Sequence, residues 1–137
     1  MLETHCACSK LRRSARIVTS LYDAALAPSG LSVAQFALLR SLARTGPCSL
    51  TAFGEATCYD RSTLNRTLRP LEEAGYIASA AGPDRRARLI DITDKARSVI
   101  AAAEPHWRDA EARIDEALGE ERVALFAILD RVEELRA

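Results

Sequence analysis

The 137-residue sequence predicts a mainly α-helical domain with a small β-hairpin, and three observations support that fold class. Apolar residues recur at helical spacing through most of the chain. The six glycines and five prolines fall mostly where helices should end. Two short segments within residues 76–92 instead read as strands around a charged turn. A chain of this length forms a single domain with its own core.

The first two helices are predicted from apolar stripes and clear end signals. The first spans about residues 8–26, where an apolar stripe lies opposite several arginines. It stops at the breaker cluster of residues 27–30. The second begins at the capping box of residues 32–35 and ends before Gly46. Both helices therefore offer an apolar face to the rest of the domain.

The third and fourth helices are predicted mainly from their capping residues. Ser49 caps a short third helix that ends near Thr57. Asp60 caps the fourth helix, and Gly75 ends it, because glycine is the usual residue just past a helix C-terminus. Two helices joined by a few residues at this point are typical of a helix-turn-helix.

The hairpin and two further helices complete the chain. Residues 76–80 and 88–92 are the predicted strands. Thr93 caps a long helix, and Gly119 separates it from a last helix at about residues 120–135. Three short helices followed by a two-stranded hairpin form a winged helix-turn-helix. The outer helices are too apolar on one side to stand alone, so we expect a second copy of the chain to cover them.

The fourth predicted helix has the most informative surface. Three leucines fall on one side of it, while arginine, asparagine and hydroxyl side chains without an acid occupy the other. Arginine suits guanine edges and phosphates, and asparagine suits adenine. The predicted DNA-binding residues of this helix are Arg61, Ser62, Thr63, Asn65, Arg66 and Arg69. The alternative interpretation is an ordinary solvated face.

Charge is unevenly distributed along a chain whose formal net charge is zero. Residues 1–97 carry 14 basic and 9 acidic side chains, and residues 98–137 carry 5 and 10. The hairpin adds Arg85, Arg86 and Arg88, which can enter a narrow minor groove or form a solvated turn. Double-stranded DNA is therefore the predicted partner.

Several functional classes are excluded by what the sequence lacks. It has no run of about 18 apolar residues, so no transmembrane helix and no membrane partner are expected. It begins without an apolar core of signal-peptide length, so we expect a cytoplasmic protein. No Ser-His-Asp order, phosphate-binding glycine loop or H-E-x-x-H motif is present, so we predict neither an enzyme nor a cofactor. A winged-helix protein-interaction module without DNA binding remains an alternative.

Four segments carry a family resemblance in order and spacing: DRSTLNR (60–66), LEEAGYI (71–77), PDRRA (83–87) and LIDITDKA (89–96). They resemble the MarR family of bacterial transcription regulators, and the likeness extends over nearly the whole chain. Ala96 is a departure, because the family usually has glycine at that position.

The resemblance implies one MarR-type domain over residues 1–137. Residues 8–30 and 97–137 would form dimerisation helices, and residues 31–96 the DNA-binding winged helix-turn-helix. It implies a homodimer that places the fourth helix in the major groove and the wing in the minor groove of a pseudo-palindromic operator. For most members it also implies a repressor that is released by a small-molecule effector or by cysteine oxidation.

A His-Cys-Ala-Cys motif lies just before the first helix. A cysteine at a helix N-terminus beside cations should have a lowered pKa, and the thiolate is the form that peroxides oxidise. We therefore predict redox sensing at Cys8, with a disulfide to Cys6 or to another subunit as a product. A metal site built from His5, Cys6 and Cys8 and a pair of incidental cysteines are the alternatives. Cys48 and Cys58 are expected to be small apolar packing residues.

The spacing from Cys8 to Tyr22 resembles that of the organic-hydroperoxide-sensing branch of the family. That resemblance implies that Tyr22 reaches the cysteine of the other subunit, since the intervening helix spans about 21 Å. Arg12 and Val33 stand where that branch has further tyrosines. A cysteine-independent aromatic or anionic effector is therefore a further alternative for the signal.

Overall fold

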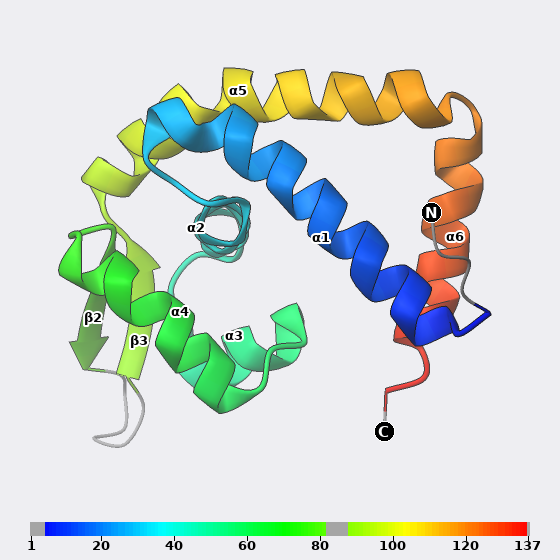
Figure 1. The fold of residues 1–137 in the computed structure, drawn as a ribbon. Coiled ribbons are helices and arrows are strands. Elements are labelled where there is room, and N and C mark those ends of the chain that lie inside the picture. Colours follow the sequence, from blue (N-terminus) through cyan, green and yellow to red (C-terminus); the bar gives the residue numbers. More distant parts are fainter. Residues whose placement is uncertain (1–4, 82–87, 137) are drawn as a thin grey trace.

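The computed structural model describes residues 5–81 and 88–136, in which helices dominate (Figure 1). Along the chain, the elements are α1 (Ala7–Leu26), η1 (Ala27–Ser29), α2 (Val33–Thr45), β1 (Cys48–Ser49), α3 (Leu50–Thr57), α4 (Arg61–Glu73), β2 (Ile77–Ala81), β3 (Arg88–Ile92), α5 (Asp94–Leu118) and α6 (Glu121–Glu133). The predicted fold class, mainly α with a small β-hairpin wing, is confirmed, and all six predicted helices are present.

The helix boundaries follow the predicted capping residues. Ser32 and Gln35 form the reciprocal capping box at the start of α2. The Ser49 hydroxyl accepts a hydrogen bond from the backbone amide of Ala52 at 3.1 Å, which caps the start of α3. Gly75, just after α4, adopts the left-handed conformation with φ of 80°, which glycine tolerates best. Local sequence signals therefore set where these helices begin and end.

The sheet has three antiparallel strands in the order β1-β3-β2, so the predicted two-stranded hairpin is incomplete. The hairpin itself is correct, with Ile77 of β2 opposite Ile92 of β3. The additional strand is β1, whose Cys48 pairs with Ile90. A two-residue strand is too short to show alternation in the sequence, so only its pairing with β3 reveals it.

The core is formed mainly by side chains of the winged part of the chain and of the first half of α5. Its fully buried large side chains are Leu26, Phe36, Leu39, Leu42, Phe53, Leu64 and Leu71. The sheet contributes Ile90 and Ile92, and α5 contributes Ala96 and Ala103. Because α2, α3, α4 and β3 all place residues in this one cluster, the winged part completes its core within a single chain.

The outer helices are less well covered by their own chain. Helix α5 extends along one edge of the molecule in contact with α1 and α2, and α6 turns away at its far end (Figure 1). Helix α6 buries none of its residues, all of which the structure describes. Large apolar side chains of α1 and α6 stay exposed: Leu11, Ile17, Val18, Val123, Phe126, Ile128 and Val132. These are the faces for which a second copy was expected.

Within the described ranges, no single helix has both the length and the apolar character needed to cross a membrane. A sharply bent pair, Ala7–Ser29 with Val33–Thr45, meets that test only when its two helices are combined.

Candidate nucleic-acid interface

Helix α4 has one buried side and one polar side, as its sequence predicts. Leu64, Leu68 and Leu71 are buried and fix the helix to the core. The opposite side chains are exposed, and they are Arg61, Ser62, Asn65, Arg66 and Arg69. Burial of the leucines fixes the position of the helix. Because the polar side chains lie on the opposite, exposed side, they remain accessible to a partner.

The start of α4 holds a carboxylate close to two of the predicted contact residues. The Ser62 hydroxyl donates to Asp60 Oδ2 at 3.2 Å. A hydrogen bond from the Thr63 side chain is the main reason why the pKa of Asp60 is lowered. A carboxylate in this position is also stabilised by the positive end of the helix dipole. Ser62 and Thr63 therefore help to organise the beginning of the helix.

The three arginines of α4 differ in their surroundings. Arg69 lies 3.9 Å from Glu73 one turn later, and both side chains are solvent-exposed. Within residues 5–81 and 88–136, neither Arg61 nor Arg66 forms an ion pair. Arg61 and Arg66 therefore give α4 two exposed guanidinium groups that no carboxylate of the described residues neutralises.

The base of the wing is part of the described structure, but its tip is not. Arg88 is exposed at the first position of β3, opposite Ala81 of β2. Arg85 and Arg86, both predicted to contact DNA, lie outside the described residues. The role of all three arginines in DNA binding stays a prediction.

Side-chain contacts that sequence reasoning missed connect the end of α4 to the start of α5, and we call them the joint. The Thr93 hydroxyl donates to the carbonyl oxygen of Gly75 at 2.6 Å. Lys95 Nζ donates to the carbonyl oxygen of Ala74 at 2.6 Å and lies 5.3 Å from the centre of the Tyr76 ring. The positive charge of the ammonium group is stabilised by the negative end of the helix dipole at the C-terminus of α4. The joint therefore links α4 directly to the long helix α5.

The N-terminal thiols lie at the start of α1, where both are exposed. Cys6 is the N-cap residue, and a hydrogen bond from the Ser9 side chain is the main reason why its pKa is lowered. The backbone amides of Ser9 and Cys8 act in the same direction. The sequence analysis favoured Cys8 as the reactive thiol, whereas the hydrogen bonds that stabilise a thiolate converge on Cys6.

The other two cysteines differ from each other. Cys48 is half-buried against the core, and burial raises its pKa, so its predicted packing role is confirmed. The same prediction is wrong for Cys58, which is exposed at the C-cap of α3 with φ of 60°. Its sulfur accepts a hydrogen bond from Arg136 Nη1 at 2.6 Å. Residue type alone could not reveal this exposed position.

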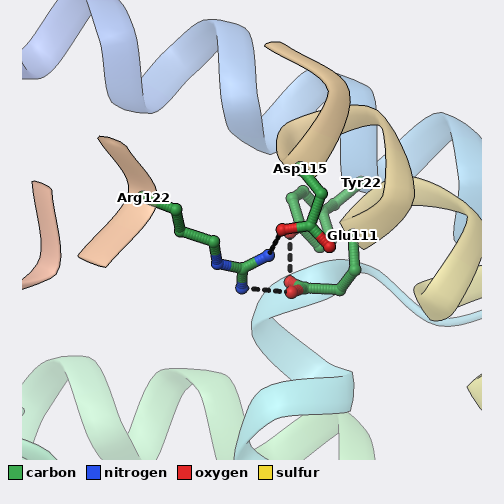
Figure 2. Close-up of polar contacts among 4 residues, drawn as sticks. All are labelled: Tyr22, Glu111, Asp115 and Arg122. Atoms are coloured by element: carbon green, nitrogen blue, oxygen red, sulfur yellow. Dashed lines mark hydrogen bonds and ion pairs between the residues drawn. The ribbon is translucent and has the colours of Figure 1, made fainter. Parts of the chain in front are cut away.

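The remaining predicted site features concern Tyr22 and a metal. Tyr22 is only 8% exposed, and its hydroxyl donates to Glu111 of the same chain (Figure 2). Its predicted contact with a cysteine of another subunit therefore stays untested, and the hydroxyl already has an acceptor. Among the described residues, no group of three His, Cys, Asp or Glu side chains is placed to hold a metal ion, so the metal alternative gains no support.

A winged helix-turn-helix whose α4 exposes a basic face defines a transcription regulator, and comparisons with known proteins agree. Residues 31–87 match the MarR family model. The chain is 30% identical over 105 residues to the HTH-type transcriptional repressor Rv2887 of Mycobacterium tuberculosis, covering 76% of each protein. It is 29% identical over 87 residues to the uncharacterised HTH-type regulator YwoH of Bacillus subtilis, covering 64% of each. The chain therefore belongs to the MarR family.

Solved structures show the same architecture over nearly the full chain. The M. tuberculosis regulator MosR, crystallised with DNA, superposes with a TM-score of 0.84 at 30% identity and covers 97% of this chain and 100% of its own. The repressor CouR, bound to a 23-mer DNA duplex, gives a TM-score of 0.85 at 27% identity, with 97% and 99% covered. These relatives are transcription regulators and not enzymes, which agrees with the sequence prediction.

Proposed function

We propose that the chain is a homodimeric repressor that binds a pseudo-palindromic DNA duplex through α4 and the wing. The observation that carries this function is the exposed polar face of α4, whose Arg61, Asn65 and Arg66 stand opposite three buried leucines. Arginine and asparagine pair with guanine and adenine edges in the major groove. The DNA-bound state of MosR and CouR supports the same partner for this chain.

The dimer is proposed from the apolar faces that the chain leaves uncovered. Phe126 is 52% and Val123 is 78% exposed on α6, where they line a groove of about 410 Å³ with Arg122, Ala127 and Asp130. Burying such side chains against a second copy is favourable by roughly 25 cal/mol per Å². Residues 8–30 and 97–137 would then form the dimer, and residues 31–96 would bind half-sites about 34–36 Å apart.

The DNA-binding proposal is tested with duplexes selected by the wild-type protein from a random pool. Replacing Arg66 or Asn65 by Ala should cost about 1–3 kcal/mol on the selected duplex if the side chain pairs with a base. Arg97→Ala on α5 is the matched control and should bind like wild type. Binding should weaken steeply with salt, because phosphate contacts release counterions. A protein that selects no duplex, or whose α4 variants bind normally, is not this repressor.

The signal is proposed to be oxidation of the Cys6–Cys8 pair. The Cys6 thiolate attacks an organic hydroperoxide, taking one oxygen to form a sulfenic acid and releasing the alcohol. Condensation with the Cys8 thiol then forms a disulfide and releases water. Because side chains two residues apart do not face each other on a helix, closing this disulfide should unwind the first turn of α1. Tyr22 has no required role in this scheme, since its hydroxyl is bonded to Glu111.

The oxidation proposal is tested by measuring operator release against hydroperoxide dose. Cys6→Ser and Cys8→Ser should bind DNA normally but keep it at doses that release the wild type. Cys48→Ser and Cys58→Ser are the controls and should still respond. If the wild type holds DNA when Cys6 is fully oxidised, the thiol pair does not carry the signal. A small aromatic or anionic effector is then the leading alternative.

A further inference from the structure

A polar cluster joins three helices at the corner between α5 and α6 (Figure 2). The hydroxyl of Tyr22 on α1 donates to one oxygen of Glu111 on α5, and Arg122 of α6 donates to the other. The same guanidinium donates through Nη1 to Asp115 Oδ1 at 2.6 Å. We name these four residues, Tyr22, Glu111, Asp115 and Arg122, the corner cluster.

The corner cluster is partly shielded from water, which strengthens its hydrogen bonds. The side chains of Arg122 and Glu111 are 25% and 20% exposed. Burial, followed by the bond to Glu111, raises the pKa of Tyr22, so this hydroxyl stays protonated and keeps donating near neutral pH. The bond to Glu111 also raises the pKa of Arg122. Tyr22 and Arg122 therefore both remain hydrogen-bond donors to Glu111 over the neutral range.

The chain offers α6 little other support at this corner. Helix α6, described along its whole length, buries no residue. The connection runs through Gly119, which has φ of 55°, a backbone conformation that glycine tolerates best. At the far end, Arg136 contacts Cys58. Arg122 forms the polar link from the beginning of α6 to α5 and, through Glu111, to α1.

The same arginine also touches the apolar face of α6. Its guanidinium carbon lies 5.1 Å from the centre of the Phe126 ring. Phe126 belongs to the exposed apolar face that the proposed dimer would bury. The direction in which that face points, and hence the position of a second copy, follows from how Arg122 is held.

We propose that Arg122, held by Glu111 and Tyr22, is a positioning residue that sets the angle of α6 and thereby the separation of the two α4 helices in the dimer. This role rests on the proposed function of a DNA-binding homodimer. Arg122 donates through one terminal nitrogen to Glu111 and through the other to Asp115, and two acceptors placed in this way suit a planar guanidinium better than an ammonium group. The expected consequence is a strict preference for one half-site spacing on DNA.

The test is a series of duplexes carrying the selected half-sites at spacings changed by one or two base pairs. Wild type should discriminate against the wrong spacings by about 100-fold, because binding both half-sites requires matching geometry. Arg122→Met keeps an unbranched apolar stem but removes the guanidinium, with its ion pairs and its contact with Phe126, and it should reduce this discrimination by about tenfold or more. Arg122→Lys should restore it only in part. Arg108→Met removes an exposed pair with Glu104 on α5 and should keep the wild-type profile.

Two further variants keep the test decisive if Arg122→Met folds poorly. Glu111→Gln and Tyr22→Phe preserve side-chain volume and should broaden the spacing preference in the same direction, with the larger change for Glu111→Gln. Equal loss of affinity at every spacing would mean a stabilising role only, and it would overturn the inference. An unchanged profile would overturn it as well. A wild type that binds no duplex would instead remove the proposed function on which the inference rests.

Discussion

The winged part of the chain and the outer helices differ in where their cores are completed. Helices α2, α3 and α4 bury their large apolar side chains against each other, the sheet and the first half of α5, and Phe36 is 1% exposed. Helix α6 does the reverse, since Phe126 is half-exposed and no residue of this fully described helix is buried. The winged part therefore completes its core within the chain, whereas α6 exposes the face that the proposed dimer would cover.

Charge divides along the sequence and not between these two regions. Residues 1–97 have five more basic than acidic side chains, and residues 98–137 have five more acidic than basic ones. The basic part includes α1 as well as the winged part, so the excess of acids lies on α6 and most of α5. The net charge of zero for the whole chain therefore conceals a separation of charge along the chain.

The largest expected effect is on the core of the winged part. Phe36→Ala removes a buried ring that lies 6.1 Å from the ring of Trp107, and it should lower the free energy of unfolding by about 3–5 kcal/mol. Urea denaturation measures the loss, which should be similar at every chain concentration. Arg44→Ala, on the exposed end of α2, should stay within about 0.5 kcal/mol of wild type. A loss of less than about 1 kcal/mol for Phe36→Ala would mean that the winged part does not depend on this buried core.

The next largest effect concerns the outer helices. Phe126→Asp places a charge on the exposed apolar face of α6 and should weaken the dimer by about 2 kcal/mol or more, roughly 30-fold in its dissociation constant. Sedimentation equilibrium measures the association, and far-UV circular dichroism should show unchanged helix content. Arg44→Ala again serves as the control. If Phe126→Asp associates like wild type, this face is not the dimer interface.

A smaller effect is expected at the joint between α4 and α5. Lys95→Met removes the bond to the Ala74 carbonyl at the end of α4, and it should cost about 0.3–1 kcal/mol because the ammonium group is exposed. DNA affinity should fall with it, since the joint holds the end of α4, the helix proposed to bind DNA. Lys10→Met, the other lysine variant, lies on α1 and should not change the stability of the winged part. Equal effects of the two variants would argue against the joint.

The smallest change involves no loss of stability and compares two thiols. The pKa of Cys6 is lowered by the hydrogen bond from Ser9, whereas burial raises the pKa of Cys48. The thiolate fraction of Cys6 should therefore rise at lower pH than that of Cys48. Iodoacetamide labelling followed by mass spectrometry measures both profiles in one sample. Ser9→Ala should move the Cys6 profile to higher pH and leave that of Cys48 in place. The opposite order of the two profiles would contradict the structure.

The parts predicted well from the sequence are those determined by neighbouring residues. The capping box at Ser32, the cap at Ser49 and the left-handed Gly75 each act within a few positions, so the helix boundaries could be predicted. The burial of Leu64 and Leu68 beside the exposed arginines of α4 follows from helical periodicity in the same way.

The parts that sequence reasoning missed depend on residues far apart in the chain. Tyr22 and Glu111 are separated by 89 positions, and no local pattern links them. Strand β1 exists only because it pairs with β3. Lys95 reaches a carbonyl 21 residues earlier, and Cys58 owes its exposure to an unusual backbone conformation. Long-range contacts of this kind are a property of the folded chain.

We propose that two chains, joined through the outer helices, bind one duplex with two α4 helices. Native mass spectrometry of the protein on its selected duplex, and on the same duplex with one half-site scrambled, measures how many chains are bound. We expect two 14.9 kDa chains on the intact duplex, with no complex of a single chain at half saturation, and much weaker binding to the scrambled one. Single chains that bind both duplexes equally well would contradict it.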